Sequence, residues 1–443
     1  MLTFSARPSS AVSAVTKRHL QPNQADVRDQ LAVRWRQPDW RNTASAPALA
    51  MLGTPGEWDP PEGVTPKKET LYLSVGIPDS GTLPRAALNE AMQKVLAENS
   101  DASLRYGFGQ GYFPLRTALA DSYRSLHPCD ISEDWYQLTN GSSGAIDLIV
   151  RSLIDPGDVI LTETPVYMGT LRNFRGVGAR IEAVPIDHEG LRIDALQAKL
   201  ADLAREGAKV KILYTISSFQ NPSGATLSLS RRHALLELAA QYGFLILDDE
   251  AYADLYYKAA PLPSLISLAN GNGVITVGTF SKTVATGLRV GWIIARPEFL
   301  ALFGRMRFDM GQNQMSLRMM AHFLSSGALQ THLPDMRELY QRKMTILADS
   351  LEREAQRHLS IVRPAGGFYL WARINGDLKS RDIWRTAAHE GVAVNPGQGF
   401  LPGETTEQEF LRIAFSWTPM DQLAEASRRI GVACARVSRG DIA

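Results

Sequence analysis

One segment carries the strongest signal in the chain: Gly278-Thr279-Phe280-Ser281-Lys282-Thr283-Val284-Ala285-Thr286-Gly287-Leu288-Arg289-Val290-Gly291-Trp292. Its lysine, Lys282, comes after a run of strand-forming residues, and Arg289 follows seven positions later. A lysine amine can condense with an aldehyde, while a guanidinium binds phosphate through paired hydrogen bonds. The segment therefore predicts a site for a cofactor that carries both an aldehyde and a phosphate.

Short apolar runs alternate with amphipathic segments from residue 71 onward. Four runs have the nearly continuous apolar character of strands buried on both faces of a parallel sheet, at residues 158–161, 210–214, 244–247 and 274–277. Helix signals separate them: one helix starts at Ser228 or Ser230 and stops at Gly243, and another follows Gly144 and stops at Pro156-Gly157. The pattern predicts an α/β fold with a mainly parallel central sheet flanked by helices.

The composition changes along the chain divide it into three expected regions. Residues 1–68 are rich in Pro, Ala, Ser and Gly and are expected to form an irregular extension or arm, whose first 25 residues resemble a disordered tail more than a transit peptide. Residues 69–325 are expected to form a large domain. Residues 326–443 are expected to form a smaller α+β domain, with a helix near 333–356 and strands at 368–371 and 411–415.

Charge and cysteine content exclude several classes of partner. Lys plus Arg is 47 and Asp plus Glu is 46 in 443 residues, which provides no overall field to attract nucleic acid. No apolar run approaches the roughly 20 residues that span a bilayer. The two cysteines, Cys129 and Cys434, lie far apart in sequence, which argues against a disulfide framework. We therefore expect a cytoplasmic protein that acts on small molecules, without a nucleic-acid or membrane partner.

Polar residues follow the predicted strands, at the sheet edge where open parallel sheets bind ligands. The loop Asn140-Gly141-Ser142-Ser143-Gly144 leads into a helix, so its backbone N–H groups can bind a phosphate, although an ordinary serine-capped loop gives the same pattern. Tyr167 follows the next strand and can stack on a flat heterocycle or simply cover the edge of the core. Both features are compatible with a phosphorylated ring.

Asn221 and the acid pair Asp248-Asp249 extend this set. Asn221, in Asn221-Pro222-Ser223-Gly224, can donate its amide to a ring oxygen or belong to a plain turn. Carboxylates that end an apolar strand are costly to bury without a cation, and a protonated pyridine nitrogen is such a cation. An exposed acidic turn and a Mg²⁺ site are the alternatives, but the chain lacks the Gly-Lys-Ser/Thr of a phosphate-binding P-loop. The pattern favours pyridoxal 5′-phosphate (PLP) and no metal.

From about residue 71 to residue 415, the chain resembles the class I/II aminotransferase branch of the aspartate-aminotransferase-like superfamily, the PLP enzymes of fold type I. The motifs that carry this resemblance are Ser74-Val75-Gly76-Ile77-Pro78, Leu104-Arg105-Tyr106-Gly107, Asn221-Pro222-Ser223-Gly224, Asp249-Glu250-Ala251-Tyr252, Ser281-Lys282, Gly287-Leu288-Arg289-Val290-Gly291-Trp292, Pro364-Ala365-Gly366-Gly367-Phe368-Tyr369-Leu370-Trp371 and Leu411-Arg412-Ile413. The resemblance implies a homodimer with shared active sites.

The resemblance also implies a role for each matching residue. Lys282 would form the Schiff base, Asp249 would bind the pyridine nitrogen, and Tyr252 would join Asn221 in hydrogen bonding the ring hydroxyl. Tyr167 would stack on the ring. The phosphate would be bound by a larger set, namely Ser142, Ser143, Thr279, Ser281, Arg289 and, across the subunit boundary, Tyr106. The substrate α-carboxylate would lie on Arg412, with Asn221 and the backbone of Gly76 nearby.

The expected activity is the transfer of an amino group from an L-amino acid to a 2-oxo acid. The motifs do not fix which bond at Cα stands perpendicular to the cofactor ring, so another PLP reaction, catalysed by a lyase, cyclase or racemase, is the alternative. Regulators of the MocR type join this fold to a DNA-binding domain. The region before residue 71 lacks a basic recognition helix, which disfavours that class.

Overall fold

The computed structural model describes residues 22–36, 40–52, 56–98, 101–107, 109–403 and 408–442. Contacts divide the chain into two compact units, Met1–Thr54 and Pro55–Ala443. The first unit contains helices α2 (Pro22–Arg34) and α4 (Ala46–Met51), where the sequence predicted an irregular arm. The predicted tail at residues 1–25 lies outside the described residues, apart from its last four positions. The domain boundaries at residues 68 and 325 stay predictions.

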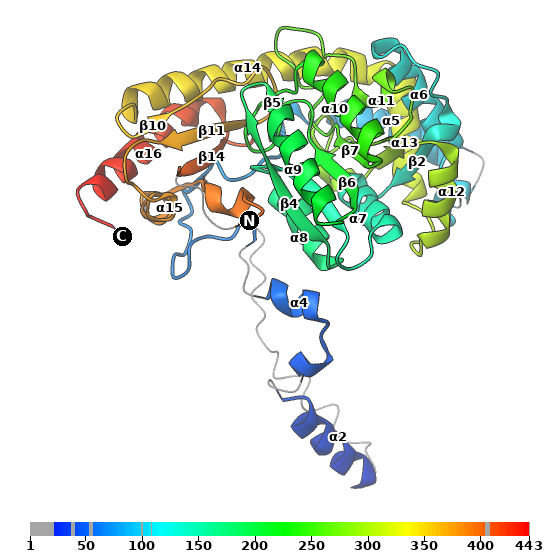
Figure 1. Cartoon of the computed structure of the whole chain (residues 1–443), viewed down its shortest axis with the longest axis horizontal. Coiled ribbons are helices and arrows are strands. Elements are labelled where there is room, and N and C mark those ends of the chain that lie inside the picture. Colours follow the sequence, from blue (N-terminus) through cyan, green and yellow to red (C-terminus); the bar gives the residue numbers. More distant parts are fainter. Residues whose placement is uncertain are drawn as a thin grey trace. The chain divides into compact units, whose positions relative to one another are not determined.

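The second unit is built on an eight-stranded sheet with the order β2-β9-β8-β7-β6-β3-β4-β5 (Figure 1). Six strands run parallel to one another, while β9 and β5 run antiparallel to their neighbours. This confirms the mainly parallel central sheet. The strands are β2 (Tyr136–Thr139), β3 (Val159–Thr164), β4 (Arg180–Asp187), β5 (Gly190–Leu191), β6 (Val210–Thr215), β7 (Leu245–Asp249), β8 (Val274–Thr279) and β9 (Gly291–Ile294).

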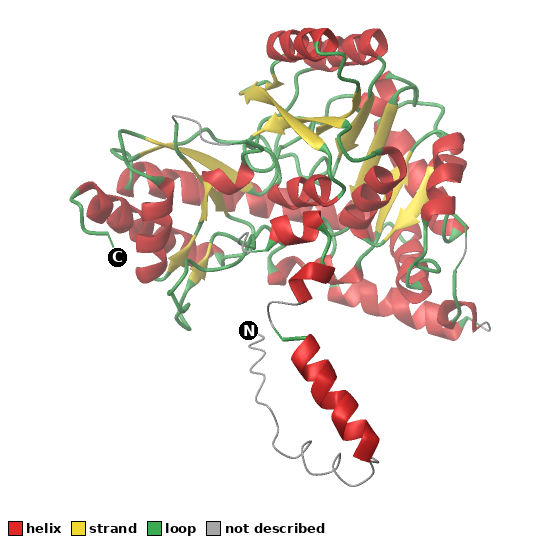
Figure 2. Ribbon diagram, turned by 60° about the horizontal axis from the view of Figure 1, so that its bottom comes forward, coloured by secondary structure: helices red, strands yellow, loops and turns green. Residues whose placement is uncertain are grey.

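Helices cover both faces of this sheet (Figure 2). Alternate strand residues enter two separate apolar cores, so Ile246 packs with one set of helices and Leu247 with the other. One face is covered by α7 (Gly141–Leu153), α8 (Met168–Gly176) and α12 (Pro297–Met306). The opposite face is covered by α5 (Arg85–Ala97), α6 (Phe113–Leu126), α9 (Ile193–Arg205), α10 (Leu229–Tyr242), α11 (Leu265–Leu268) and α13 (Gln314–Ser325).

A smaller antiparallel sheet with the order β10-β11-β14-β13 lies in the C-terminal part. Its strands are β10 (Leu359–Ser360), β11 (Tyr369–Ile374), β13 (Asn395–Pro396) and β14 (Phe410–Ala414). It is accompanied by α14 (Ala328–Glu354), α15 (Ser380–His389) and α16 (Leu423–Ser438). The predicted long helix and both predicted strands of this part are thereby confirmed, with ends shifted by a few residues.

A short parallel pair ties the beginning of the second unit to its C-terminal part. Strand β1 (Leu71–Tyr72) pairs with β12 (Val392–Ala393), and the N–H of Ala414 donates to the carbonyl of Leu73 at 2.7 Å. Gly76 lies four residues after β1 and is therefore held close to the C-terminal part of the unit.

The ends of two helices can be compared with those predicted from capping residues. Helix α10 has Ser228 at its N-cap and ends at Gly243 in the left-handed conformation (φ 73°), as predicted. The helix expected to follow Gly144 begins instead at Gly141, so the expected loop forms the first helical turn. None of the described helices is long and apolar enough to cross a bilayer.

Candidate active site

The predicted residues follow strands whose C-terminal ends lie at the same edge of the large sheet. Asp249 ends β7, and Lys282, Tyr167 and Ser142 each come three residues after β8, β3 and β2. Asn221 comes six residues after β6. Because these strands are parallel, their ends meet at one edge, and residues from distant sequence positions are brought together there.

Lys282 lies at the centre of this edge. Its Nζ donates a hydrogen bond to the carbonyl oxygen of Gly76 at 2.8 Å and lies 5.7 Å from the centroid of the Tyr252 ring. Burial lowers the pKa of the Lys282 amine to about 8, against the opposing effect of the Glu57 carboxylate. The neutral, nucleophilic form of this amine is therefore easier to reach than that of an exposed lysine.

The two acids at the end of β7 face opposite sides of the sheet. Asp249 accepts hydrogen bonds from the Tyr214 hydroxyl at 3.0 Å and from the Ala251 N–H at 3.2 Å. Burial raises the pKa of Asp249 to about 6, although both hydrogen bonds oppose this shift. Asp248 instead accepts from the N–H and hydroxyl of Ser217. The two carboxylates therefore have different partners, and the absence of a metal site stays a prediction.

The residues predicted to bind phosphate, which we call the phosphate end, combine a helix start with a guanidinium. Ser142 and Ser143 lie in the first turn of α7, whose leading N–H groups lack partners within the helix. Arg289, in the left-handed conformation (φ 54°), donates from its Nη2 to the carbonyl of Asn140 at 3.1 Å. Gly141 has a φ of 75°, which L side chains rarely adopt, and a Cβ there would lie 2.7 Å from that Nη2, so a substitution would strain the backbone and displace the guanidinium.

Thr279 and Ser281 fix the turn between β8 and Lys282. The Thr279 hydroxyl donates to the Ser281 hydroxyl at 3.0 Å and accepts from the Ser281 N–H at 3.1 Å. Both side chains are buried. Tyr106, predicted to serve a neighbouring subunit, is 73% exposed.

A second group of residues surrounds Arg412, which is fully buried; we call this group the carboxylate end, after the role predicted for Arg412. Its Nη1 donates to Glu57 at 2.8 Å and to the Asn221 side-chain oxygen at 3.2 Å. Its Nη2 donates to the Ser74 carbonyl at 2.8 Å and to the Asn395 side-chain oxygen at 2.9 Å. The guanidinium is thus held rigidly, and one of these four acceptors is a carboxylate.

Aromatic rings enclose this guanidinium. Its central carbon lies 4.6 Å from the Tyr369 ring centroid and 4.7 Å from that of Phe400. The Tyr369 hydroxyl pairs with that of Tyr252 at 3.0 Å, while the Tyr167 hydroxyl donates to Glu57 at 3.3 Å. The structure therefore connects Tyr167 to the carboxylate end, and its stacking on a cofactor ring stays a prediction.

Several residues at the site were missed by the sequence reasoning. Tyr369 belongs to the motif at residues 364–371, which carries part of the family resemblance, so the sequence indicates its importance. Tyr214 lies within a strand that was predicted, but nothing in the sequence indicated its contact with Asp249. Glu57 and Asn395 gave no signal, because their contacts with Arg412 span 355 and 17 residues and follow no local spacing.

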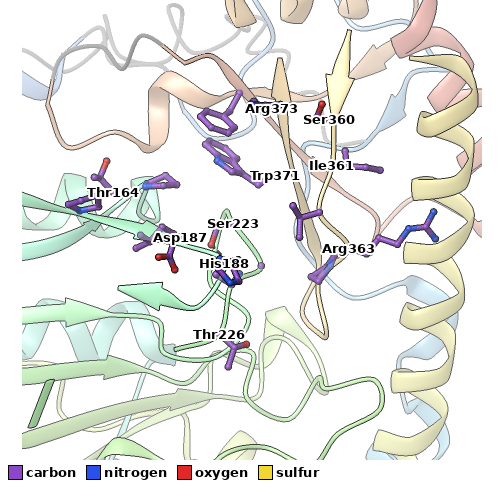
Figure 3. A pocket seen from close by; sticks show the side chains of 18 of the residues that line it. Thr164, Asp187, His188, Ser223, Thr226, Ser360, Ile361, Arg363, Trp371 and Arg373 are labelled. Carbon is purple, nitrogen blue, oxygen red and sulfur yellow. Dashed lines mark hydrogen bonds between the residues drawn. The ribbon is translucent and has the colours of Figure 1, made fainter. Parts of the chain in front are cut away.

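A cavity of about 690 Å³ is lined by residues from both sheets and their loops (Figure 3). Its walls include Thr164 at the end of β3, His188 between β4 and β5, and Ser223 after β6. The small sheet contributes Ser360, Trp371 and Arg373, among others. Its walls do not include Lys282, Asp249 or Arg412. The chemistry of the side chains, rather than this cavity, therefore identifies the active site.

The donors and acceptors at the sheet edge fit pyridoxal 5′-phosphate. The helix start and Arg289 suit its phosphate, the Lys282 amine suits its aldehyde, and the buried Asp249 carboxylate suits its protonated ring nitrogen. Gly141 leaves room where the guanidinium meets the helix start.

Comparison with known proteins identifies the family. The model of the family "Aminotransferase class I and II" matches residues 68–430. The aromatic-amino-acid aminotransferase 1 of Thermococcus litoralis is 34% identical over 364 residues, covering 82% of this chain and 87% of that one. The multiple substrate aminotransferase of Thermococcus profundus superposes with a TM-score of 0.84 at 29% identity, covering 91% of this chain and 100% of that one.

A third relative was crystallised with a derivative of the cofactor. LysN, the α-aminoadipate aminotransferase of Thermus thermophilus, forms a complex with N-(5′-phosphopyridoxyl)-L-leucine. It is 31% identical, with a TM-score of 0.78 and coverage of 84% of this chain and 94% of that one. The chain belongs to the aminotransferase class I and II family and is a pyridoxal 5′-phosphate-dependent amino-acid aminotransferase.

Proposed function

We propose that this enzyme transfers the amino group of L-α-amino acids with aromatic or long side chains to a 2-oxo acid, with Lys282 as the proton carrier. One observation supports this most: the Lys282 amine has a lowered pKa and is held by the Gly76 carbonyl, while Arg412 is fixed nearby. The relatives named for aromatic amino acids and for α-aminoadipate suggest the side-chain classes.

The chain's own residues would hold the cofactor at three points. The first turn of α7, with Ser142 and Ser143, would bind the phosphate together with Arg289. Asp249 would keep the ring nitrogen protonated, because a buried carboxylate is stabilised by an adjacent cation. Tyr252, whose ring lies next to Lys282, would join Asn221 in hydrogen bonding the ring hydroxyl.

When bound, the cofactor supplies an aldehyde that accepts the amino group and a ring that withdraws electrons from the substrate Cα. Arg412 would bind the α-carboxylate through paired charge-assisted hydrogen bonds and so orient Cα. Lys282 Nζ would then take the Cα proton, because an amine with a pKa near 8 is a competent base at physiological pH. The Gly76 carbonyl would position that amine.

Spectroscopic half-reactions test the proposed substrates. The holoenzyme would be mixed with single amino acids, while the absorption of the bound cofactor and the 2-oxo acid product are measured. We expect conversion with phenylalanine, tyrosine and 2-aminoadipate, and a stoichiometric 2-oxo acid. Conversion only of small amino acids, or release of ammonia, would contradict the proposal.

We further propose a homodimer with shared sites, in the cytoplasm. The exposed Tyr106 is available to a neighbouring subunit, and the two cysteines, Cys129 and Cys434, are both free thiols, which suits a reducing compartment. Mixing inactive Lys282→Ala with Tyr106→Ala protein tests the sharing. Because one of the two sites in a mixed dimer would then contain both wild-type residues, activity should recover on mixing. A monomer in light scattering would refute the dimer.

A further inference from the structure

The Glu57 carboxylate is bound to Arg412, the residue to which we assign the α-carboxylate of the substrate. Its Oε1 accepts from Arg412 Nη1 at 2.8 Å, and its Oε2 accepts from the Tyr167 hydroxyl at 3.3 Å. The Asn395 side-chain amide holds the Glu57 main-chain carbonyl at 2.7 Å. Three contacts from three different segments therefore place this carboxylate in the site.

The segment that carries Glu57 is shaped to present it. The Gly56 N–H donates to the Asp59 carboxylate at 2.5 Å, and the Asp59 N–H returns a hydrogen bond to the Gly56 carbonyl at 3.3 Å. This closed turn has Glu57 near its tip. Only 16% of the Glu57 side chain remains exposed, in contrast to the exposed Glu62 a few residues later.

An amino-acid α-carboxylate has the same charge and the same two oxygens as the Glu57 side chain. The three remaining acceptors of Arg412 are neutral oxygens, of Ser74, Asn221 and Asn395. If a substrate carboxylate also bound this buried guanidinium, it would lie close to the Glu57 carboxylate, and the two negative charges would repel each other strongly. Glu57 and a substrate carboxylate therefore cannot both use Arg412 Nη1.

We propose that Glu57 is an internal competitor of the substrate, which an α-carboxylate must displace from Arg412. The inference rests on the proposed role of Arg412 as the carboxylate-binding residue. Glu57 then determines specificity, because a plain amine offers no carboxylate to replace it and leaves the Glu57–Arg412 pair in place. A carboxylate ligand, in contrast, releases the 56–59 turn when it binds.

Calorimetry with an unreactive carboxylate tests the competition. The probe is 3-phenylpropionate, which carries a carboxylate and an aromatic ring but no amino group, added to the holoenzyme. Glu57→Gln keeps the size of the side chain and removes its charge, so we expect the Kd for the probe to fall about tenfold, as loss of one ordinary charge-assisted competitor predicts. The matched control Glu62→Gln, in the same segment, should leave the Kd unchanged.

Two further measurements separate the possible outcomes. Asp59→Asn weakens the turn that presents Glu57 and should lower the Kd in the same direction, by a smaller factor. Hydrogen exchange in residues 56–62 should speed up when the probe binds to the wild-type enzyme. An unchanged or higher Kd for Glu57→Gln, or unchanged exchange on binding, would overturn the competition.

Arg412→Lys distinguishes a failure of this inference from a failure of the proposed function. If Arg412 binds the carboxylate, Arg412→Lys should weaken 3-phenylpropionate binding whatever residue occupies position 57. If Arg412→Lys leaves the Kd unchanged, the proposed function of Arg412 is wrong. If Arg412→Lys weakens binding and Glu57→Gln does not strengthen it, only the internal competitor is wrong.

Discussion

The two ends of the active site are built in different ways. The phosphate end comes from two stretches of chain, around residues 140–143 and 279–289, and relies on backbone N–H groups and one exposed guanidinium. The carboxylate end draws on five separate positions, and its ion pair joins residues 355 positions apart. Its guanidinium is fully buried and already paired.

The difference separates two ways of binding an anion. At the phosphate end, the donors are the N–H groups of a helix start and an exposed guanidinium, and no counter-ion has to be removed before a ligand arrives. At the carboxylate end, the buried charge of Arg412 needs a counter-ion at all times, which Glu57 provides. A substitution at the phosphate end should therefore change the affinity for the cofactor, and a substitution at the carboxylate end should change the affinity for the substrate.

Lys282→Ala should have the largest effect, because the residue lies between the two ends and is our proposed proton carrier. We expect the amino-transfer rate to fall by about 10²–10⁴-fold, the usual contribution of a positioned acid/base group. The cofactor should remain bound through its phosphate, but borohydride should no longer fix it to the chain. Rate assays and mass spectrometry measure both effects, with the exposed Lys258→Ala as control. Retained attachment in Lys282→Ala would contradict the assignment.

Arg412→Lys should break the carboxylate end alone. The substitution loses the fork that binds a carboxylate through two hydrogen bonds, so we expect kcat/KM for amino acids to fall about 10²-fold, equivalent to about 2.7 kcal/mol. Cofactor affinity should stay within about twofold, because Arg412 is not part of the phosphate end. The exposed Arg373→Lys, on the adjacent strand of the same sheet, is the matched control. Loss of cofactor affinity in Arg412→Lys would show that the two ends are not independent.

The same contrast explains how much of the site could be predicted from the sequence. The strand runs, the helix caps at Ser228 and Gly243, and the order of polar residues after each strand are local patterns, and they indicated the fold and the sheet edge. Arg412 was found only through a motif. Its partner Glu57 lies in a Pro- and Gly-rich segment that the sequence assigned to an arm, and a contact over 355 residues leaves no local spacing to detect.

Asp249→Asn tests a residue that lies outside both the phosphate end and the carboxylate end of the site. In the cofactor-free protein, burial raises the Asp249 pKa from about 3.8 to about 6, so between these values the folded state binds more protons than the unfolded state. The free energy of unfolding therefore falls as the pH rises through this window, by at most about 3 kcal/mol. Asn does not titrate, so the variant should be the more stable protein above pH 6.

Urea unfolding of both cofactor-free proteins between pH 4 and pH 8 measures this effect. The stability advantage of Asp249→Asn should disappear near pH 4, where the folded wild-type carboxyl is protonated and little of the pH-dependent loss has yet occurred. A constant difference across the range would show that hydrogen bonding to Tyr214, rather than the buried charge, controls the stability at this position.

Arg289→Gln should have the smallest effect, because the phosphate end distributes its binding over several groups. The exposed guanidinium is one donor beside the first turn of α7, whose N–H groups remain in the variant. We expect cofactor affinity to fall about tenfold, or about 1.4 kcal/mol, with the KM for amino acids unchanged. Titration of the cofactor-free protein measures it, with the exposed Arg305→Gln as control. A change in KM as large as that of Arg412→Lys would mean that the phosphate end also positions the substrate, and the two ends would then act as one.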